Sequence, residues 1–527
     1  MDESHANFSA ERDQPRTRRQ FINDSARVGA AATLSTLGSS QTIAESDSVA
    51  RSTNPITLEN QKPGTRDWQL TRVRLDKTGG YRSPGIEGYC SAQSVQAGDR
   101  LDIMVSTRPA ASFQIEIFRT GYYQGLGARL VREFGPFPGV SQPDPQIGER
   151  RVRECQWEPC VSFTIPDDWT SGVYLGRLTT LPESKNEPYW QSHLIFIVTD
   201  KRPADILLQC SDNTWQAYNR WPDNYSLYTS PEGSLKADSD VSFDRPYGKY
   251  SQIFESSQSV GSGEYRLWEF PLAYWLEQHG YDVSYASNRD LLTPDRALKC
   301  KTFISVGHDE YWDLRQYHSV KELIQEGVNA LFLSGNSICF VSPFQASSAG
   351  QANRIISRQG RYGGLTEAEK QAYPAMGPFP ITDAPNENLI MGARTITPFN
   401  GGGDWIVTRP DHWMFHNTGM KKGDAIPGLV GWEFHGGPAD IPGLEVVAEG
   451  TAFSGGTQPA HWKSTIYPGP QGNFVFNAST IWWAQGLASP PGHMLPWSHW
   501  SRPHGPDTRV QQITHNLLQR AIHSQPG

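Results

Sequence analysis

Short runs of alternating hydrophobic and polar residues follow one another between Trp68 and about Val198. The clearest runs are Leu101 to Val105, Phe113 to Phe118, Val173 to Leu178 and His193 to Val198. Successive side chains of a strand point to opposite faces, so this period of two indicates strands with a buried face. Many short strands separated by turn residues are typical of a β-sandwich. We therefore predict a β-sandwich domain over residues 65–200.

The pattern changes after Lys201-Arg202-Pro203, where short apolar runs alternate with helix-like segments. The apolar runs predicted as strands are Ile206 to Cys210, Tyr281 to Tyr285, Thr302 to Val306 and Ala330 to Ser334. The predicted helices are Glu269 to His279, closed by Gly280, and Tyr311 to Gln325, closed by Gly327. Alternating strands and helices favour a largely parallel sheet covered by helices. Residues 203–523 are therefore predicted to form an α/β domain.

The last part of this α/β domain has a different composition. From about Ala384 to Gly486 the chain is rich in glycine and proline, with short strands such as Phe474 to Asn477. We predict that this part forms a lid and an extension of the sheet. A last helix is expected near Val510 to His523. A length of 527 residues exceeds the range in which one core keeps growing, which also favours two domains.

The first 50 residues have the layout of an export signal and a linker. Arg18-Arg19 precedes Phe21-Ile22, and a mildly apolar stretch, Val28 to Leu34, and a Ser/Thr-rich segment follow. This order is typical of a twin-arginine signal. We expect residues 1–50 to direct export of the folded protein to the periplasm or the outside. The alternative is a basic tail in which the Arg-Arg pair arose by chance.

Charge and composition exclude two classes of partner. The net charge is −8, and no block of Lys and Arg lies beyond the first twenty residues, which argues against nucleic acid. No apolar run reaches the ~18 residues needed to span a membrane. The 17 Trp, 20 Tyr and 22 Phe supply aromatic surface suited to pockets. Among the six cysteines, Cys155 and Cys160 could close a small loop outside the cytoplasm.

The strongest candidate for chemistry is Gly307-His308-Asp309-Glu310-Tyr311-Trp312, which follows the predicted strand Thr302 to Val306. Ligands of open α/β sheets bind beyond the carboxyl ends of the strands. Gly335-Asn336 falls at another such end. A purely structural interpretation is also available, in which Asp309 caps the next helix and Glu310 lies in its first turn.

Two further segments contain candidate residues. Trp215-Gln216-Ala217-Tyr218-Asn219-Arg220-Trp221, with Tyr225 and Tyr228 after it, follows the predicted strand Ile206 to Cys210. Aromatic residues at this density more often pack a loop than bind a ligand. In Val241 to Tyr247, Arg245 is either a structural ion-pair residue or a clamp for the substrate.

Together these segments resemble the large (β) subunit of N,N-dimethylformamidase and the family named after it. The resemblance covers about Gly85 to Ala521 and includes Glu87 to Tyr89, Phe118 to Tyr123, Ile426 to Gly431 and Phe476 to Thr480. It implies a β-sandwich followed by a glutamine-amidotransferase-like α/β domain. It also implies a mononuclear iron held by two tyrosines and a glutamate, and it leaves the oxidation state of the iron open, with Fe³⁺ favoured.

Carried over motif by motif, the resemblance implies that the iron ligands are Tyr218, Tyr228 and Glu310, with Tyr225 close enough to compete with Tyr228. It places His308 beside the metal, where it supports the ligands or carries a proton. Ferric iron suits phenolate and carboxylate oxygens, and its open positions could activate water and an amide carbonyl. The set differs from the ligands of non-haem iron oxygenases, which favours hydrolysis. Further candidates for substrate contact or ligand support are Asp309, Arg245 and Asn336.

One departure from the family concerns the floor of the pocket. Many relatives carry an aromatic pair ending in tryptophan shortly after the Gly-Asn pair, whereas this chain has Ser337-Ile338-Cys339-Phe340 after Gly335-Asn336. A different pocket floor is therefore expected. Dimethylformamide is accordingly not assumed to be the substrate.

Two hypotheses for the function follow. The first is an exported iron-dependent amidohydrolase that cleaves a small or exposed, formamide-like C–N bond with metal-activated water. The second is an exported binding protein with a degenerate catalytic domain, whose aromatic-rich sandwich holds carbohydrate or another surface ligand. Tyr218, Tyr228, His308 and Glu310 together favour the first, and bound iron would discriminate between them. A glycosidase is disfavoured because neighbours such as Asp309 and Glu310 rarely present both carboxylates at ~5 to 9.5 Å. The sequence leaves open the oligomeric state and the need for a small subunit.

Overall fold

The structure, a computed structural model, describes residues 54–523 except 77–79, 185, 234, 251, 253–255, 373–382, 456 and 497–502. The predicted twin-arginine segment lies outside the described residues. Within them, no helix is both long enough and apolar enough to cross a membrane.

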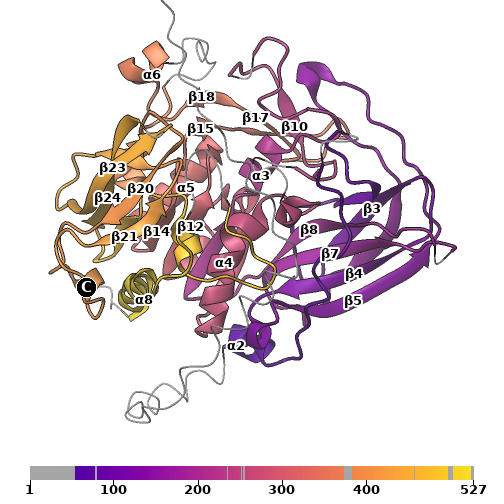
Figure 1. The fold of residues 1–527 in the computed structure, drawn as a ribbon, viewed down its shortest axis with the longest axis horizontal. Coiled ribbons are helices and arrows are strands. Elements are labelled where there is room, and N and C mark those ends of the chain that lie inside the picture. Colours follow the sequence, from indigo (N-terminus) through magenta and orange to yellow (C-terminus); the bar gives the residue numbers. More distant parts are fainter. Residues whose placement is uncertain are drawn as a thin grey trace, which may run out of the picture. The chain divides into compact units, whose positions relative to one another are not determined.

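Two antiparallel-rich sheets form the predicted β-sandwich (Figure 1). One has the strand order β2-β8-β7-β4-β5 and the other β1-β3-β6. The strands are β1 (Gly85–Cys90), β2 (Ser94–Gln96), β3 (Arg100–Arg108), β4 (Phe113–Thr120), β5 (Ala128–Phe137), β6 (Pro159–Thr164), β7 (Gly172–Thr180) and β8 (Gln191–Thr199). Their inner faces share a core that includes Ile103, Ile115, Leu178 and Phe196. The strands predicted from the alternating pattern are thereby confirmed.

The outer face of the five-stranded sheet is also buried. In β8, Leu194, Phe196 and Val198 point into the sandwich core. Ile195 and Ile197 point the other way and join a second core with residues of the next sheet. All nine residues of β8 are therefore buried. The sandwich and the following part of the chain consequently share one continuous apolar core.

A nine-stranded sheet with the order β11-β9-β12-β14-β25-β24-β23-β20-β21 lies beyond this core. Its strands are β9 (Ile206–Cys210), β11 (Val283–Ser287), β12 (Thr302–His308), β14 (Asn329–Gly335), β20 (Gly401–Ile406), β21 (Ala425–Val430), β23 (Glu445–Ser454), β24 (Gln458–Pro468) and β25 (Phe474–Asn477). The pairings from β11 to β25 are parallel, and those from β25 to β21 are antiparallel. The Gly/Pro-rich part thus extends the sheet as predicted. Because its strands are joined as hairpins, the sheet is mixed rather than largely parallel.

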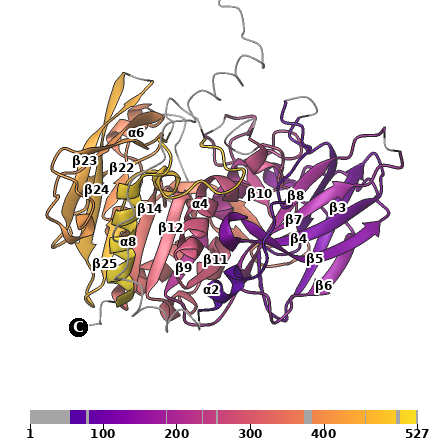
Figure 2. The same ribbon diagram turned by 60° about the horizontal axis from the view of Figure 1, so that its bottom comes forward.

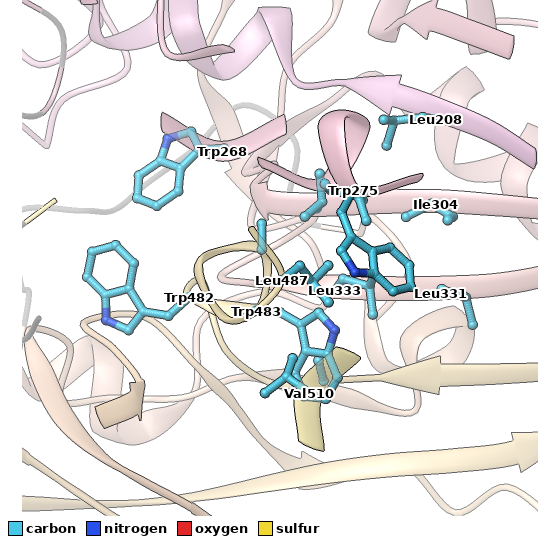
Figure 3. Close-up of a cluster of buried hydrophobic side chains, with 14 of the residues drawn as sticks. Leu208, Trp268, Trp275, Ile304, Leu331, Leu333, Trp482, Trp483, Leu487 and Val510 are labelled. Atoms are coloured by element: carbon cyan, nitrogen blue, oxygen red, sulfur yellow. The ribbon is translucent and has the colours of Figure 1, made fainter. Parts of the chain in front are cut away.

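Helices cover both faces of the parallel half. On one face α4 (Tyr265–Gln278) and α8 (Thr508–His523) pack against Leu208, Ile304 and Leu331. On the other face α5 (Leu314–Gln325) packs against a second set of residues from the same strands, Leu207, Phe303 and Phe332. Figure 2 shows α4 and α8 on the same side of these strands, and Figure 3 shows Trp275, Trp483 and Val510 around Ile304 and Leu331.

Shorter elements complete the described part. The helices are α2 (Pro55–Asn60), α3 (Asp212–Tyr218), α6 (Glu367–Ala372) and α7 (Asn388–Met391). The strands are β10 (Asp240–Ser242), β13 (Tyr311–Trp312), β15 (Phe340–Val341), β16 (Phe344–Gln345), β17 (Ile355–Ser357), β18 (Gln359–Arg361), β19 (Ala393–Thr395) and β22 (His435–Pro438). They form the small sheets β10-β17-β16, β13-β15-β18 and β19-β22. Of these, α3, β13 and β15 follow the carboxyl ends of β9, β12 and β14, where the candidate residues lie.

Two predicted helix starts are wrong. Helix α4 begins at Tyr265 rather than at Glu269. Helix α5 begins at Leu314 rather than at Tyr311, because Asp313 is its N-cap and accepts a hydrogen bond from the N–H of Arg315. Asp309 is therefore not the cap of this helix.

The possible small disulfide loop is not formed. All six cysteines carry free thiols in the described part of the chain. The Cys160 thiol instead donates to the carbonyl oxygen of Ile103 at 3.2 Å.

Candidate active site

The candidate residues lie where β9 and β12 end. Tyr218 is the last residue of α3, the helix that follows β9, and Glu310 comes just after β12. Gly307 turns the chain at the end of β12 with a φ of 71°. A Cβ atom on Gly307 would lie 2.5 Å from the Cβ of Trp268, so only glycine fits between the strand and α4.

Three oxygen-bearing side chains predicted as metal ligands lie together. The Tyr218 hydroxyl donates to Oε2 of Glu310 at 2.7 Å, and the Tyr228 hydroxyl donates to Oε1 at 3.4 Å. The two hydroxyl oxygens are 3.1 Å apart, and the rings stack with centroids 4.9 Å apart. Burial and the Glu310 carboxylate raise the pKa of Tyr218 well above its ordinary value. The pKa of Tyr228 is raised by the same two causes, so both phenols are harder to deprotonate here than in water.

Tyr225, the competing candidate, lies away from this cluster. Its ring contacts the guanidinium groups of Arg151 and Arg153, whose Cζ atoms are 4.7 and 4.5 Å from the ring centroid. The geometry thus brings Tyr228, and not Tyr225, to Glu310.

His308 is fully buried between two carboxylates. Its Nε2 lies 3.2 Å from Oε2 of Glu310 and 2.9 Å from Oε2 of Glu433. Burial lowers the pKa of His308, but Glu433 and Glu310 outweigh this effect and raise it well above its ordinary value. The aromatic rings of Trp268 and Trp432 stand edge-on to the imidazole. The imidazole is therefore held by two carboxylates and packed against two indole rings.

Glu433 is a residue of this site that the sequence interpretation missed. It lies between β21 and β22, far along the chain from Glu310. Its backbone can approach β14 because a Cβ atom on Gly335 would lie only 2.2 Å from the carbonyl oxygen of Glu433. One local signal could have pointed to it: Glu433 stands between two aromatic residues, Trp432 and Phe434, in a segment that would be expected to be buried. A buried carboxylate needs a partner, which would have marked Glu433 as a candidate.

The backbone of Glu310 is fixed from both directions. Its N–H donates to Oγ1 of Thr214 at 3.0 Å, and its carbonyl oxygen accepts from the N–H groups of Cys339 and Phe340 at 2.9 and 3.0 Å. Beside it, the hydroxyl groups of Tyr311 and Tyr228 form a short hydrogen bond. The backbone from which the Glu310 carboxylate extends is therefore held in place.

A cavity of about 250 Å³ opens next to the cluster. Tyr218, Tyr228, Glu310 and Glu433 form one end, and the apolar lining includes Leu235, Phe340, Phe399 and Trp432. Cys339 and Phe340, from the segment that departs from the family pattern, also line it. This volume is below the ~300–1,000 Å³ of typical ligand pockets, so the cavity suits a small molecule. His308 is not among the lining residues and reaches the cavity only through Glu310 and Glu433.

Of the remaining candidates, only Asn336 lines the cavity. Its backbone has a φ of 54°, and its Oδ1 has no hydrogen-bond partner among the described residues. The Asp309 carboxylate accepts from Ser305 at 2.8 Å and from Asn288 at 3.2 Å, away from the cavity.

Arg245 is buried and donates to the backbone carbonyl oxygens of Asn219, Trp221 and Tyr225 at 2.9, 2.9 and 2.8 Å. Burial lowers the pKa of Arg245 to about 9. This side chain holds the loop that carries the tyrosines rather than facing the cavity.

Within the described residues, no group of three or more His, Cys, Asp or Glu side chains is placed to hold a metal ion. The predicted ligand set contains one residue of these types, Glu310, and two tyrosines.

The β-rich fold thus brings two partly buried tyrosines and a buried glutamate together beside a small cavity. The family described as N,N-dimethylformamidase beta subunit-like, C-terminal, matches residues 114–496, and the chain belongs to this family. The family is one of dimethylformamidase-like hydrolases and implies an amide hydrolase.

No curated protein sequence matches the chain. Among solved structures, a superoxide reductase (neelaredoxin) from Ignicoccus hospitalis is 15% identical, with a TM-score of 0.13 over 21% of this chain and 79% of that chain. The soluble domain of PmoD from Methylocystis sp. is 15% identical, with a TM-score of 0.14 over 24% of this chain and 95% of that one. A family 123 glycoside hydrolase from Clostridium perfringens is 9% identical, with a TM-score of 0.12 over 52% of each chain. Similarity at this level carries no argument about function.

Proposed function

We propose that this protein is an amide hydrolase that cleaves a small or exposed, formamide-like C–N bond and uses one ferric ion held by Tyr218, Tyr228 and Glu310. The observation that carries the proposal is the meeting of these three side chains at the end of a small cavity. Membership of the dimethylformamidase-like family supports the type of reaction.

The donor set fits a small, hard cation. The oxygen atoms of Tyr218, Tyr228 and Glu310 are separated by 2.7, 3.1 and 3.4 Å. Metal–oxygen bonds of ~2.0–2.1 Å at right angles place neighbouring ligand oxygens about 2.9 Å apart. The set contains neither cysteine nor histidine, the ligands that zinc sites favour. Loss of the two hydroxyl protons would let the three oxygens share one cation.

When bound, the ion would act as a Lewis acid toward water and the amide carbonyl. Hydrolysis joins the water oxygen to the carbonyl carbon and breaks the C–N bond, which gives a carboxylic acid and an amine. The proton that the water loses has to reach the amine nitrogen. Glu433 lines the cavity and contacts His308, so we infer that Glu433 transfers this proton while His308 holds its carboxylate and balances its charge.

The placement of the tyrosines also favours the enzyme over the binding protein. A degenerate catalytic domain has no physical reason to keep two phenols, a carboxylate and a paired histidine around one cavity, because burying such groups is unfavourable. We further propose that the parallel half of the nine-stranded sheet is the glutamine-amidotransferase-like domain implied by the resemblance. Helices on both of its faces support this assignment.

The ligand set is tested by metal content. Glu310→Gln, Tyr218→Phe and Tyr228→Phe should each lose iron and hydrolysis of a panel of small formamides, since each removes a ligand anion. Tyr225→Phe is the matched control and should keep both, because the Tyr225 ring contacts Arg151 and Arg153 rather than Glu310. Iron bound to tyrosinate should colour the native protein. Full iron occupancy in Glu310→Gln, or a colourless zinc protein after expression with iron, would refute the site.

The proton path is tested separately. Glu433→Gln and His308→Ala should keep most of the iron, because neither residue is a proposed ligand. Glu433→Gln should lower kcat by ~10²- to 10⁴-fold, the usual effect of losing a proton carrier. Unchanged turnover in this variant would remove Glu433 from the mechanism.

We also propose export by the twin-arginine route, supported by Arg18-Arg19 before Phe21-Ile22. Lysine at both arginine positions should leave a tagged protein in the cytoplasm, as measured by cell fractionation. Export at the wild-type level would contradict the signal interpretation.

A further inference from the structure

A strained turn forms part of the cavity wall between β14 and β15. Within Gly335 to Phe340, both Asn336 and Ile338 have a φ of 54°. Left-handed backbone is uncommon for residues other than glycine and is an outlier for a β-branched residue. Such residues persist only where the surroundings hold them, often at functional sites.

One set of contacts ties this turn to Glu310. The N–H of Ile338 donates to the carbonyl oxygen of Asp309 at 3.1 Å. The next two N–H groups, of Cys339 and Phe340, donate to the carbonyl oxygen of Glu310 at 2.9 and 3.0 Å. A change in the turn would therefore move the backbone of Glu310.

A second contact holds the turn from the opposite direction. The N–H of Ser337 donates to Nε2 of His435, which is fully buried, at 3.1 Å. Nδ1 of His435 lies 2.9 Å from Oδ1 of Asn477 in β25. Because Nε2 accepts a hydrogen bond, Nδ1 carries the proton and donates it to Asn477. Burial lowers the pKa of His435 to about 4, which agrees with a neutral ring.

Asn477 is itself held in place. Its Oδ1 also accepts from the N–H of Ser479 at 2.9 Å, and Asn477 belongs to β25, next to β14 in the sheet. The imidazole thus connects β25 to the turn: its Nδ1–H donates to Asn477, and its Nε2 accepts from Ser337. A protonated ring would present an N–H to the N–H of Ser337 and lose this connection.

We propose that His435 is a positioning residue of the active site, which acts through Ser337 to keep the strained turn against Glu310 and the cavity wall in place. Its effect on catalysis rests on the proposed function, whereas its effect on the turn does not. The side-chain hydrogen bonds of His435 go to Ser337 and Asn477 rather than to Tyr218, Tyr228 or Glu310, so its influence on the ligands passes through the turn.

The full chain carrying His435→Asn, which has no acceptor near the Nε2 position, tests this inference. Hydrogen exchange of the amides from Ser337 to Phe340 should accelerate about fivefold or more, as expected for a lost hydrogen bond. With a small formamide as substrate, kcat should fall by ~10- to 100-fold, as for other residues that support a ligand, and KM should change little. His435→Gln, which places an acceptor near Nε2, should restore most of both properties.

His493→Asn is the matched control. His493 is a half-buried histidine whose pKa is also lowered to about 4, and it contacts Gln485 and the backbone of Arg266 rather than the turn. If His435→Asn fails to fold, Asn477→Ser tests the same link and should accelerate exchange in the turn.

Unchanged exchange in the turn of His435→Asn, or equal acceleration in His493→Asn, would overturn the inference. If the wild-type protein hydrolyses no amide but His435→Asn still loosens only the turn, the proposed function fails and the positioning role stands. If hydrolysis is intact in wild type and His435→Asn alike, the catalytic part of the inference is refuted.

Discussion

Two glycines allow distant parts of the chain to meet at the site. Gly307 lies against Trp268 of α4, and Gly335 lies against the backbone of Glu433. In both places a single Cβ atom would come within 2.5 Å of a neighbour. The same two positions precede His308 and Asn336, so a shift at either glycine would be transmitted directly to the site.

Gly307→Ala should destabilise the protein and lower its activity. A left-handed backbone costs a residue with a Cβ atom roughly 1–2 kcal/mol, and overpacking adds about 1–3 kcal/mol. Gly350→Ala is the matched control, because Gly350 has a φ of 78° but nothing within 4 Å of its Cβ position. The free energy of unfolding, measured with urea, should fall clearly further for Gly307→Ala. An equal loss of unfolding free energy in Gly307→Ala and Gly350→Ala would show that the added methyl group fits beside Trp268 without strain.

At the scale of elements, the start of α5 shows what the sequence could and could not provide. The strand before it, β12, was predictable from its apolar run. The pattern after this strand predicts that Tyr311 and Trp312 already belong to the helix. They instead form β13, which pairs with Phe340 and Val341. That pairing is a contact between distant segments, which local periodicity does not report.

Asp313→Ala should weaken the start of α5. Its carboxylate accepts from the N–H groups of Arg315 and Phe344 at 2.8 and 2.9 Å. Loss of an N-cap typically costs ~0.5–2 kcal/mol, and the N–H of Phe344 would also lose its partner. Asp411→Ala, at an exposed position, should change the free energy of unfolding by less than about 0.5 kcal/mol.

The effect of Asp313 should depend on pH. Burial raises the pKa of Asp313, but the hydrogen bonds from Arg315 and Phe344 outweigh it, so the pKa in the folded state is lowered. Because the pKa of Asp313 is lowered in the folded state, its carboxylate stabilises the fold fully above the unfolded-state pKa of ~3.9. This stabilisation is lost as the pH falls through the folded-state pKa. The difference in unfolding free energy between wild type and Asp313→Ala should therefore be constant near neutrality and shrink below about pH 4. A difference that grows on acidification would contradict this assignment.

At the scale of the whole molecule, the active site and the shared core depend on contacts between distant segments. Tyr218, Tyr228 and Glu310 could be named from the sequence because the motifs that contain them resemble those of the dimethylformamidase family. Glu433 could not, because its segment reaches the site only through the antiparallel half of the sheet. Similarly, the run His193 to Val198 predicted a strand, but only its packing against β11 explains why both of its faces are apolar.

Arg119→Met should destabilise the sandwich and the nine-stranded part together. Arg119 of β4 and Glu277 of α4 are fully buried and form two hydrogen bonds of 2.8 and 3.1 Å. Removal of one partner leaves a buried charge uncompensated, which typically costs ~3–5 kcal/mol. Because the two parts also share the core around Ile195 and Leu208, we expect a single unfolding transition at lower denaturant concentration.

Arg100→Met, which removes an exposed ion pair with Asp102, is the control and should change the free energy of unfolding by less than about 1 kcal/mol. Calorimetry with separate transitions for the sandwich and the rest would show that the shared core does not couple them.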